Sequence, residues 1–234
     1  MTEDRQGSLL TMHKWRVIFF DVGNTLLFPD WGHILAPLHQ RGVYPTTEQW
    51  SSVERKTKQE FDQLIHDGKI DHGFWHIFHS RMLAELGIQD KDLLNALVGT
   101  VRISANWCAI LPGTRDILQD LGKDFELAVI SNADGKIADV LRKCGIADCF
   151  RTITDSGIVG HEKPHRAIFQ TALHSMNAAP GESLYVGDLY SVDYVGATNA
   201  GMQGVLLDVC GAYRDAGFPR IESLDELEML LATL

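Results

Sequence analysis

The stretch that decides the fold reads Trp15-Arg-Val-Ile-Phe-Phe-Asp21-Val-Gly-Asn-Thr-Leu26, near the start of a 234-residue chain. Its first half is rich in β-branched and aromatic side chains, which favour a strand. Because the apolar residues follow one another without alternation, the run is typical of a strand buried on both faces of a parallel sheet. The run ends on an acid, Asp21, and the turn signal Gly23-Asn24 follows at once.

Later runs of the same kind predict further strands, at residues 126–131, 151–154, 183–187 and 203–208. The stretches between and after these runs carry apolar residues at helical spacing. They lie at 114–121, 136–144, 165–176, 192–200 and 221–234. Strands that alternate with helices indicate βαβ units, so we predict an α/β fold with a Rossmann-like parallel sheet flanked by helices.

Residues 30–107 interrupt this alternation and contain no strand-like run. Apolar stripes recur there at helical spacing. They comprise Trp50, Val53, Thr57, Phe61 and Leu64, then Trp75, Phe78, Met82 and Leu86, then Leu93, Leu94 and Leu97. We therefore predict an all-helical, four-helix cap at 30–107. The rest of the chain then divides into an N-terminal arm at 1–14, in which Met12 is a second candidate start, and a core at 15–29 and 108–234.

Composition and charge exclude several classes of protein. The formal net charge of -10 disfavours a nucleic-acid partner, because an acidic surface repels phosphate backbones. No apolar run approaches the roughly 20 residues that a membrane span needs, so we expect no membrane partner. The four cysteines are scattered, which favours reduced thiols and a cytoplasmic location. The sequence leaves the oligomeric state open. The cysteines are Cys108, Cys144, Cys149 and Cys210.

Chemically active side chains stand where the predicted strands end. Asp21 ends the first strand, Ser131 ends the strand at 126–131, and Asp188 follows the strand at 183–187 with Asp193 just beyond. Ligands of parallel sheets bind beyond the carboxyl ends of the strands. The sequence therefore predicts one crevice that receives three carboxylates, a hydroxyl and, from the loop at 160–164, the ammonium of Lys163. Carboxylates next to a phosphate suit Mg²⁺, and such a set suits phosphoryl transfer.

These segments resemble the four signature motifs of the haloacid dehalogenase-like hydrolase superfamily, in the right order. The motifs are Asp21-Val-Gly-Asn-Thr-Leu26, Ile130-Ser131-Asn132, Lys163-Pro164 and Gly187-Asp188-Leu-Tyr-Ser-Val-Asp193. The resemblance covers essentially Trp15 to the C-terminus. The helical segment between the first two motifs is similar to the helical cap of that superfamily.

The resemblance implies a Mg²⁺-dependent phosphatase that acts on a small phosphorylated metabolite. Asp21 would be the nucleophile that forms an aspartyl-phosphate, and Thr25 would help to orient its loop. Ser131, Asn132 and Lys163 would hold the phosphate, with Lys163 also steadying the nucleophile. The metal would be bound by Asp21, by the backbone carbonyl of Gly23 and by Asp188, with Asp193 in the first or second coordination shell.

One residue departs from the phosphatase pattern. The pattern has an Asp two residues after the nucleophile, as general acid and then base, whereas this chain has Gly23. General acid–base help is worth about 10²- to 10⁴-fold in rate. Asp30, His33 or a cap residue would have to substitute for it if the substrate is an alkyl phosphate.

The missing acid keeps three alternatives open. The 2-haloacid dehalogenases of the superfamily have an aromatic residue at that position and use the Asp on carbon, without the metal-binding acids. The phosphonate hydrolases have a small residue there and form an imine with a cap lysine, for which Lys56, Lys58 and Lys69 are candidates. The third alternative is a catalytically weak metal- or phosphate-binding protein.

Two groups of histidines resemble metal motifs but are interpreted otherwise. The string His161-Glu-Lys-Pro-His165 matches the H-E-x-x-H zinc pattern. That pattern requires a helix, which Pro164 disfavours at the residue before it. His72, His76 and His79 share one face of a predicted helix over two turns, and we interpret this face as a polar surface of the cap.

Overall fold

The computed structural model describes residues 14–69 and 73–234. The predicted N-terminal arm, with its second candidate start at Met12, lies outside the described residues except for Lys14. The fold is the predicted α/β architecture. Its centre is a six-stranded sheet in which all neighbouring strands are parallel, in the order β5-β4-β1-β6-β7-β8. The strands are β1 (Val17–Phe20), β4 (Glu126–Ser131), β5 (Thr152–Asp155), β6 (Ser183–Gly187), β7 (Gln203–Leu207) and β8 (Arg220–Ile221).

Strand β1 has an uninterrupted apolar run because both faces of the strand are buried. Successive side chains of a strand point to opposite faces of the sheet. Ile18 and Phe20 belong to a hydrophobic cluster on one face, and Val17 and Phe19 belong to a second cluster on the other face. All four side chains are fully buried, which places β1 in the middle of a sheet covered on both sides.

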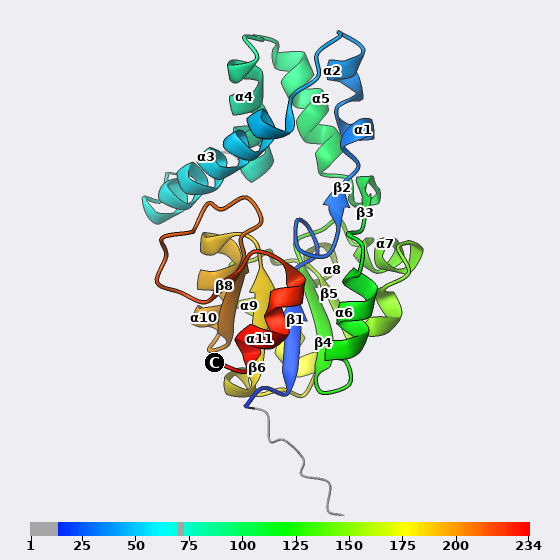
Figure 1. The fold of residues 1–234 in the computed structure, drawn as a ribbon, viewed down its shortest axis with the longest axis vertical. Helices are drawn as coiled ribbons and strands as arrows, with labels where there is room; N and C mark the ends of the chain where they lie inside the picture. The colour runs from blue at the N-terminus through cyan, green and yellow to red at the C-terminus, as the bar shows by residue number, and fades with distance from the viewer. Residues whose placement is uncertain (1–13, 70–72) are drawn as a thin grey trace, which may run out of the picture.

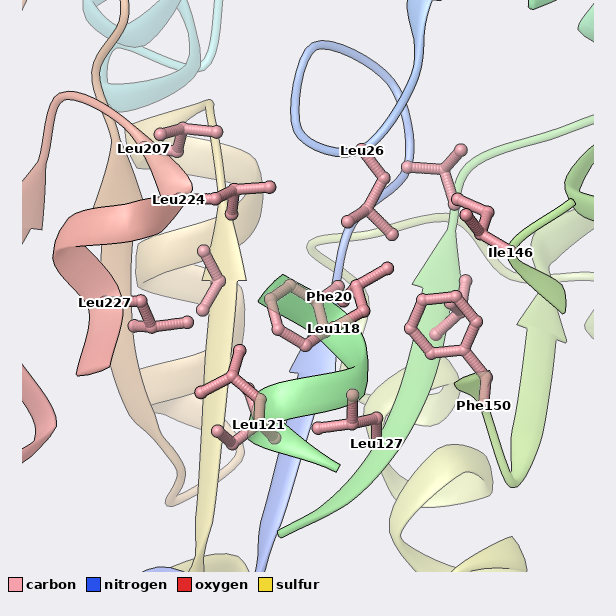
Figure 2. Close-up of a cluster of buried hydrophobic side chains, with 14 of the residues drawn as sticks. Phe20, Leu26, Leu118, Leu121, Leu127, Ile146, Phe150, Leu207, Leu224 and Leu227 are labelled. Atoms are coloured by element: carbon pink, nitrogen blue, oxygen red, sulfur yellow. The ribbon is translucent and has the colours of Figure 1, made fainter. Parts of the chain in front are cut away.

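Helices cover both faces of the sheet. One face packs against α6 (Thr114–Leu121), α7 (Ile137–Lys143) and α11 (Leu227–Leu231), and Figure 2 shows Leu118 and Leu121 of α6 lying over Phe20 and Leu127 of the sheet. The other face packs against α9 (Arg166–Ser175) and α10 (Val195–Asn199). The short helix α8 (Ser156–Val159) follows β5.

The helical insertion lies between Pro29 and Trp107, and its described residues form five α-helices where four were predicted. It contains α1 (Trp31–Ile34), α2 (Ala36–His39), α3 (Thr47–His66), α4 (Phe74–Glu85) and α5 (Lys91–Val101). The first two are single turns separated by Leu35, and Pro37 in α2 has no N–H to continue the helical ladder. Figure 1 shows these helices gathered beyond one end of the sheet, the end at which the parallel strands finish.

Three features were not predicted from the sequence. Strands β2 (Phe28–Pro29) and β3 (Trp107–Ala109) pair as a short antiparallel ribbon where the insertion joins the core. The edge strand β8 takes Ile221, the first residue of the stretch predicted as a helix, and a 3-10 turn at Leu224–Glu226 precedes α11, which starts at Leu227. The third is a π-helical turn over Tyr190–Tyr194, just before α10. In the described part of the chain, no helix has the length and apolar character to cross a bilayer.

Candidate active site

The carboxyl ends of the three central strands bring the predicted acids together. Asp21 follows β1, Ser131 ends β4, and Asp188 follows β6, and these strands are neighbours in the sheet. The backbone N–H of Asp21 donates to Val186 O at 2.8 Å, which ties the end of β1 to β6. One carboxylate oxygen from each of Asp21, Asp188 and Asp193 lies within 4.8 Å of the others, and all three residues are buried.

Lys163 is the cation at the centre of this group. Its ammonium donates to Asp21 Oδ1 at 2.7 Å, to Asp193 Oδ1 at 2.8 Å and to the hydroxyl of Tyr185 at 2.7 Å. Burial lowers the pKa of Lys163, but the carboxylates of Asp193 and Asp21 outweigh burial, and the pKa lies above its usual value. Lys163 is therefore charged, and all three of its N–H bonds are used.

Asp193 is held by the local backbone as well as by Lys163. Its Oδ2 accepts from the N–H groups of Asp188 and Leu189, at 3.1 and 3.0 Å. A Cβ on Gly187 would collide with the Asp193 carboxylate, so glycine is required there by close approach. The π-helical turn carries this carboxylate, and such turns are frequent at functional sites. Both oxygens of Asp193 are thus engaged in hydrogen bonds, which fits an outer coordination shell.

The electrostatics of Asp21 favour a bound cation. Burial is the largest cause that raises the pKa of Asp21, and the nearby Asp193 and Asp188 carboxylates add to it. Lys163 opposes these effects, yet the pKa of Asp21 is raised to about 7. A divalent cation shared with Asp188 would relieve this repulsion. Hydrogen bonds from described residues engage Asp21 only at Oδ1 and Asp188 only at Oδ2 and its carbonyl, which leaves an oxygen of each for a metal.

The other predicted phosphate-binding residues lie near this group in different ways. Ser131 is buried and lines the same cavity as Asp21. The Asn132 side chain accepts from the Lys163 N–H at 2.7 Å and donates to the Lys163 carbonyl at 3.0 Å, so it fixes the loop that carries Lys163. Thr25 is buried, but it does not line the cavity, and its hydroxyl has no hydrogen-bond partner among the described residues.

A cavity of about 580 Å³ lies between the acids and the helical insertion. Gly23 and Asn24 line it on the core side, and aromatic rings line it on the other. The rings belong to Phe61, Phe74, Trp75 and Trp107. Asp30 and His33, considered as substitutes for the missing acid, do not line the cavity, and both are exposed.

Lys58 on α3 is the one candidate lysine that reaches the site. Its ammonium lies 2.9 Å from Asp188 Oδ2 and donates to the Asp188 carbonyl at 3.0 Å. Lys56 and Lys69 instead form exposed ion pairs with Glu85 and Asp67. Burial lowers the pKa of Lys58, but the neighbouring Asp188 and Glu54 carboxylates outweigh burial and hold the pKa above its usual value.

One residue at the site was not singled out from the sequence, and another was considered for a different role. Tyr185 contributes a hydroxyl that contacts both Lys163 and Asp193, and a polar-tipped residue inside an apolar strand was the available signal. The role of Lys58 toward Asp188 was also missed. Its signal was the polar stripe on α3 at helical spacing, Arg55, Lys58, Gln59 and Asp62.

The histidines of the two groups differ in their burial. His161 and His165 are exposed, and His165 lies just before α9 and caps it, so the string around Pro164 forms no zinc-binding helix, as predicted. The prediction of a polar face was wrong for His79, which is fully buried. Its helix α4 is apolar on more than one side, so the histidine faces the interior of the insertion. His72 lies outside the described residues.

The profile of the haloacid dehalogenase-like hydrolases matches residues 15–201, most of the chain. The chain belongs to the haloacid dehalogenase-like hydrolases. The family confirms the resemblance carried by the four motifs and makes this protein a hydrolase.

One relative of this chain is the haloacid dehalogenase-like hydrolase domain-containing protein 3 of Xenopus laevis. The two are 30% identical over 82% of this chain and 84% of that protein. The pyrimidine 5'-nucleotidase YjjG of Escherichia coli is 27% identical over 93% of this chain and 98% of its own. Among solved structures, the HAD-hydrolase YfnB of Bacillus subtilis has a TM-score of 0.67 at 20% identity, covering 93% of this chain and 99% of that one. This last likeness concerns the fold.

Proposed function

We infer that this hydrolase is a Mg²⁺-dependent phosphatase that cleaves a small phosphorylated metabolite through an aspartyl-phosphate at Asp21. One observation carries the inference. A buried carboxylate with a raised pKa lies 2.7 Å from a buried ammonium and shares its pocket with two more carboxylates. A phosphatase relative, the nucleotidase YjjG, aligns over nearly the whole chain and supports the choice.

The residues present fit the roles of such a reaction. A carboxylate oxygen of Asp21 attacks phosphorus, a P–O bond to Asp21 forms, and the P–O bond to the leaving group breaks. Lys163 donates to Asp21 Oδ1 and balances the charge of the carboxylate, while Asn132 keeps the Lys163 loop in place. The hydroxyl of Ser131 donates to a phosphoryl oxygen. Water then cleaves the aspartyl-phosphate and releases phosphate.

The carboxylate set fits Mg²⁺ as the cofactor. Asp21, Asp188 and the backbone carbonyl of Gly23 would bind it, and Asp193 would orient Lys163 and the Asp188 backbone around it. Hard oxygen ligands of this kind suit Mg²⁺. When bound, the ion would offset negative charge on the phosphoryl oxygens.

The same geometry weighs against the alternatives. A dehalogenase that works without metal would have no use for Asp188 and Asp193, two buried acids beside the nucleophile. An imine with a phosphonate substrate needs a neutral amine, whereas Lys58 is ion-paired with Asp188. A metal- or phosphate-binding protein without turnover would use the same residues, so activity has to distinguish it from a phosphatase.

The proposal includes a small phosphorylated molecule as the partner and the cytoplasm as the location. The cavity of about 580 Å³ suits a small-molecule phosphate, and the net charge of -10 disfavours a nucleic-acid polymer. All four cysteines are free thiols, as expected in the reducing cytoplasm.

Hydrolysis of an aryl phosphate tests the function. The wild type should be active with Mg²⁺ and inactive with chelator, and intact mass spectrometry after a rapid quench should detect a phosphoryl adduct. Asp21→Asn should abolish both signals, whereas Asp139→Asn, a matched change at an exposed acid of α7, should change neither. An unchanged rate in Asp21→Asn would overturn the assignment.

A further inference from the structure

The helical insertion docks on the core through polar side chains of one stripe on α3. Arg55 donates to Cys210 O at 3.0 Å, and Gln59 donates to Ala212 O at 3.3 Å. Asp62 accepts from the Ser191 N–H at 3.0 Å and from the Tyr213 hydroxyl at 2.7 Å. These partners lie in the π-helical turn that follows β6 and in the loop that follows β7.

Lys58 lies in the middle of this stripe and is its most buried member, with 1% of its surface exposed. Its ammonium is bound by the carbonyl and Oδ2 of Asp188, at 3.0 and 2.9 Å, and lies 3.5 Å from Glu54 Oε1. It therefore reaches out of the insertion to a carboxylate of the core. Lys58 does not line the cavity, so it makes no contact with a substrate there.

The charges around the site show what this contact does. Three core carboxylates, Asp21, Asp188 and Asp193, face one core ammonium, Lys163. Lys58 adds a second ammonium, which comes from the insertion and lies directly against Asp188, while Glu54 of the same helix lies 3.5 Å from this ammonium and offsets part of its charge. The added charge acts in opposite directions on the two ions that a phosphatase must hold, since it repels a divalent cation and attracts a phosphate dianion.

We propose that Lys58 is a positioning residue that orients Asp188 and sets the charge of the site, so that docking of α3 favours phosphate and opposes Mg²⁺. This proposal rests on the proposed phosphatase function. By linkage, phosphate strengthens docking of the insertion and Mg²⁺ alone weakens it. The bond to Oδ2 also leaves the other carboxylate oxygen of Asp188 without a hydrogen bond from the described residues.

Ion binding by the full-length protein tests the proposal without turnover. The stabilisation of the protein against thermal unfolding is measured as Mg²⁺ is titrated alone, and then as inorganic phosphate is titrated at saturating Mg²⁺. Lys58→Met should tighten Mg²⁺ binding about tenfold and weaken phosphate binding about tenfold, because one charge is removed from a desolvated site. Lys56→Met removes an exposed ammonium from the same helix and should change neither affinity.

A second variant tests docking of α3 while the charged side chain of Lys58 is kept. Asp62→Ala removes two docking bonds of α3 and leaves Lys58 in place. It should shift both affinities in the same directions as Lys58→Met, by a smaller factor. If Lys58→Met matches Lys56→Met in both titrations, or shifts both affinities the same way, the proposal is overturned. If Mg²⁺ does not stabilise the wild type, or does so equally in Asp188→Asn, the metal site itself is overturned, and the role of Lys58 with it.

Discussion

The indole ring of Trp107 lies against Gly23, with its Cζ3 atom 3.1 Å from the position that a Cβ on Gly23 would take. The ring is held there from two sides. Its Nε1 donates to Val101 O at 2.7 Å, and its centroid lies 5.3 Å from that of Trp75 in the insertion. An acid side chain at residue 23 would therefore have to displace this aromatic ring of β3.

This relationship predicts how an introduced acid will behave. Gly23→Asp alone should give little gain toward alkyl phosphates, because its side chain needs the space that the ring fills. Gly23→Asp with Trp107→Leu should gain about 10²-fold in kcat/KM, the lower range of general acid–base help. The control is Trp107→Leu alone. An equal gain from the single Gly23→Asp change would show that Trp107 is no obstacle.

The kcat/KM of the wild type should depend steeply on the pKa of the leaving group. Without a proton donor at residue 23, an aryl phosphate that leaves as a stable anion should react about 10²- to 10⁴-fold faster than an alkyl phosphate. The measurement is kcat/KM across aryl phosphates of increasing leaving-group pKa, with glycerol phosphate as the alkyl member. Equal rates would instead indicate that Glu162 or Asp134, which also line the cavity, donates the proton.

Asp21→Asn should stabilise the metal-free protein at neutral and higher pH. Burial and neighbouring carboxylates raise the pKa of Asp21 from 3.8 to about 7, so the folded state binds more protons than the unfolded state between these values. Stability contributed by this group is therefore lost as pH rises through that window, by on the order of a few kcal/mol. In Asp21→Asn, Lys163 keeps its bonds to Asp193 and Tyr185.

Urea unfolding between pH 4.5 and 8.5, in the presence of chelator, measures this effect. The free energy of unfolding of Asp21→Asn should exceed that of the wild type by an amount that grows as pH rises. Mg²⁺ should reduce this difference by stabilising the wild type alone. A difference in unfolding free energy that is constant with pH would contradict the raised pKa of Asp21.

The convergence of the acids could be predicted from the sequence because parallel strands end at one edge of their sheet. Asp21, Ser131 and Asp188 each stand at the end of an apolar run, so the strand pattern alone placed them together. The contacts that were missed join residues far apart along the chain. Lys58 meets Asp188 across 130 positions, and Trp107 reaches Gly23 from a ribbon of two- and three-residue strands too short to leave a pattern.

His79 shows a different limit of the sequence. Helical spacing placed it on a face with His76, but spacing gives only the direction of a side chain and not the width of the apolar surface that it meets. The fold packs α4 against α3 and α5, and Phe78, Met82 and Leu83 are buried on the same helix. The interior is therefore wide enough to include His79.

The burial of His79 predicts an acid-sensitive insertion. Burial lowers the pKa of His79 from 6.5 to about 4, and neither ring nitrogen has a hydrogen-bond partner among the described residues. The unfolded state then binds more protons between these values, so stability is lost as pH falls from about 6.5 toward 4, by on the order of 3 kcal/mol. His79→Leu should remove this loss, and it should be more stable above pH 7 because two unpaired polar atoms leave the interior.

Urea unfolding of the two proteins from pH 7.5 to 4.5 checks this prediction, with His66→Leu as the control at an exposed position of α3. The difference in unfolding free energy between His79→Leu and the wild type should grow steadily below pH 6.5. Because the wild type must protonate a buried imidazole or unfold around it, the insertion should also become sensitive to protease first in that range. If the two proteins lose stability in parallel as pH falls, His79 is not the group that titrates.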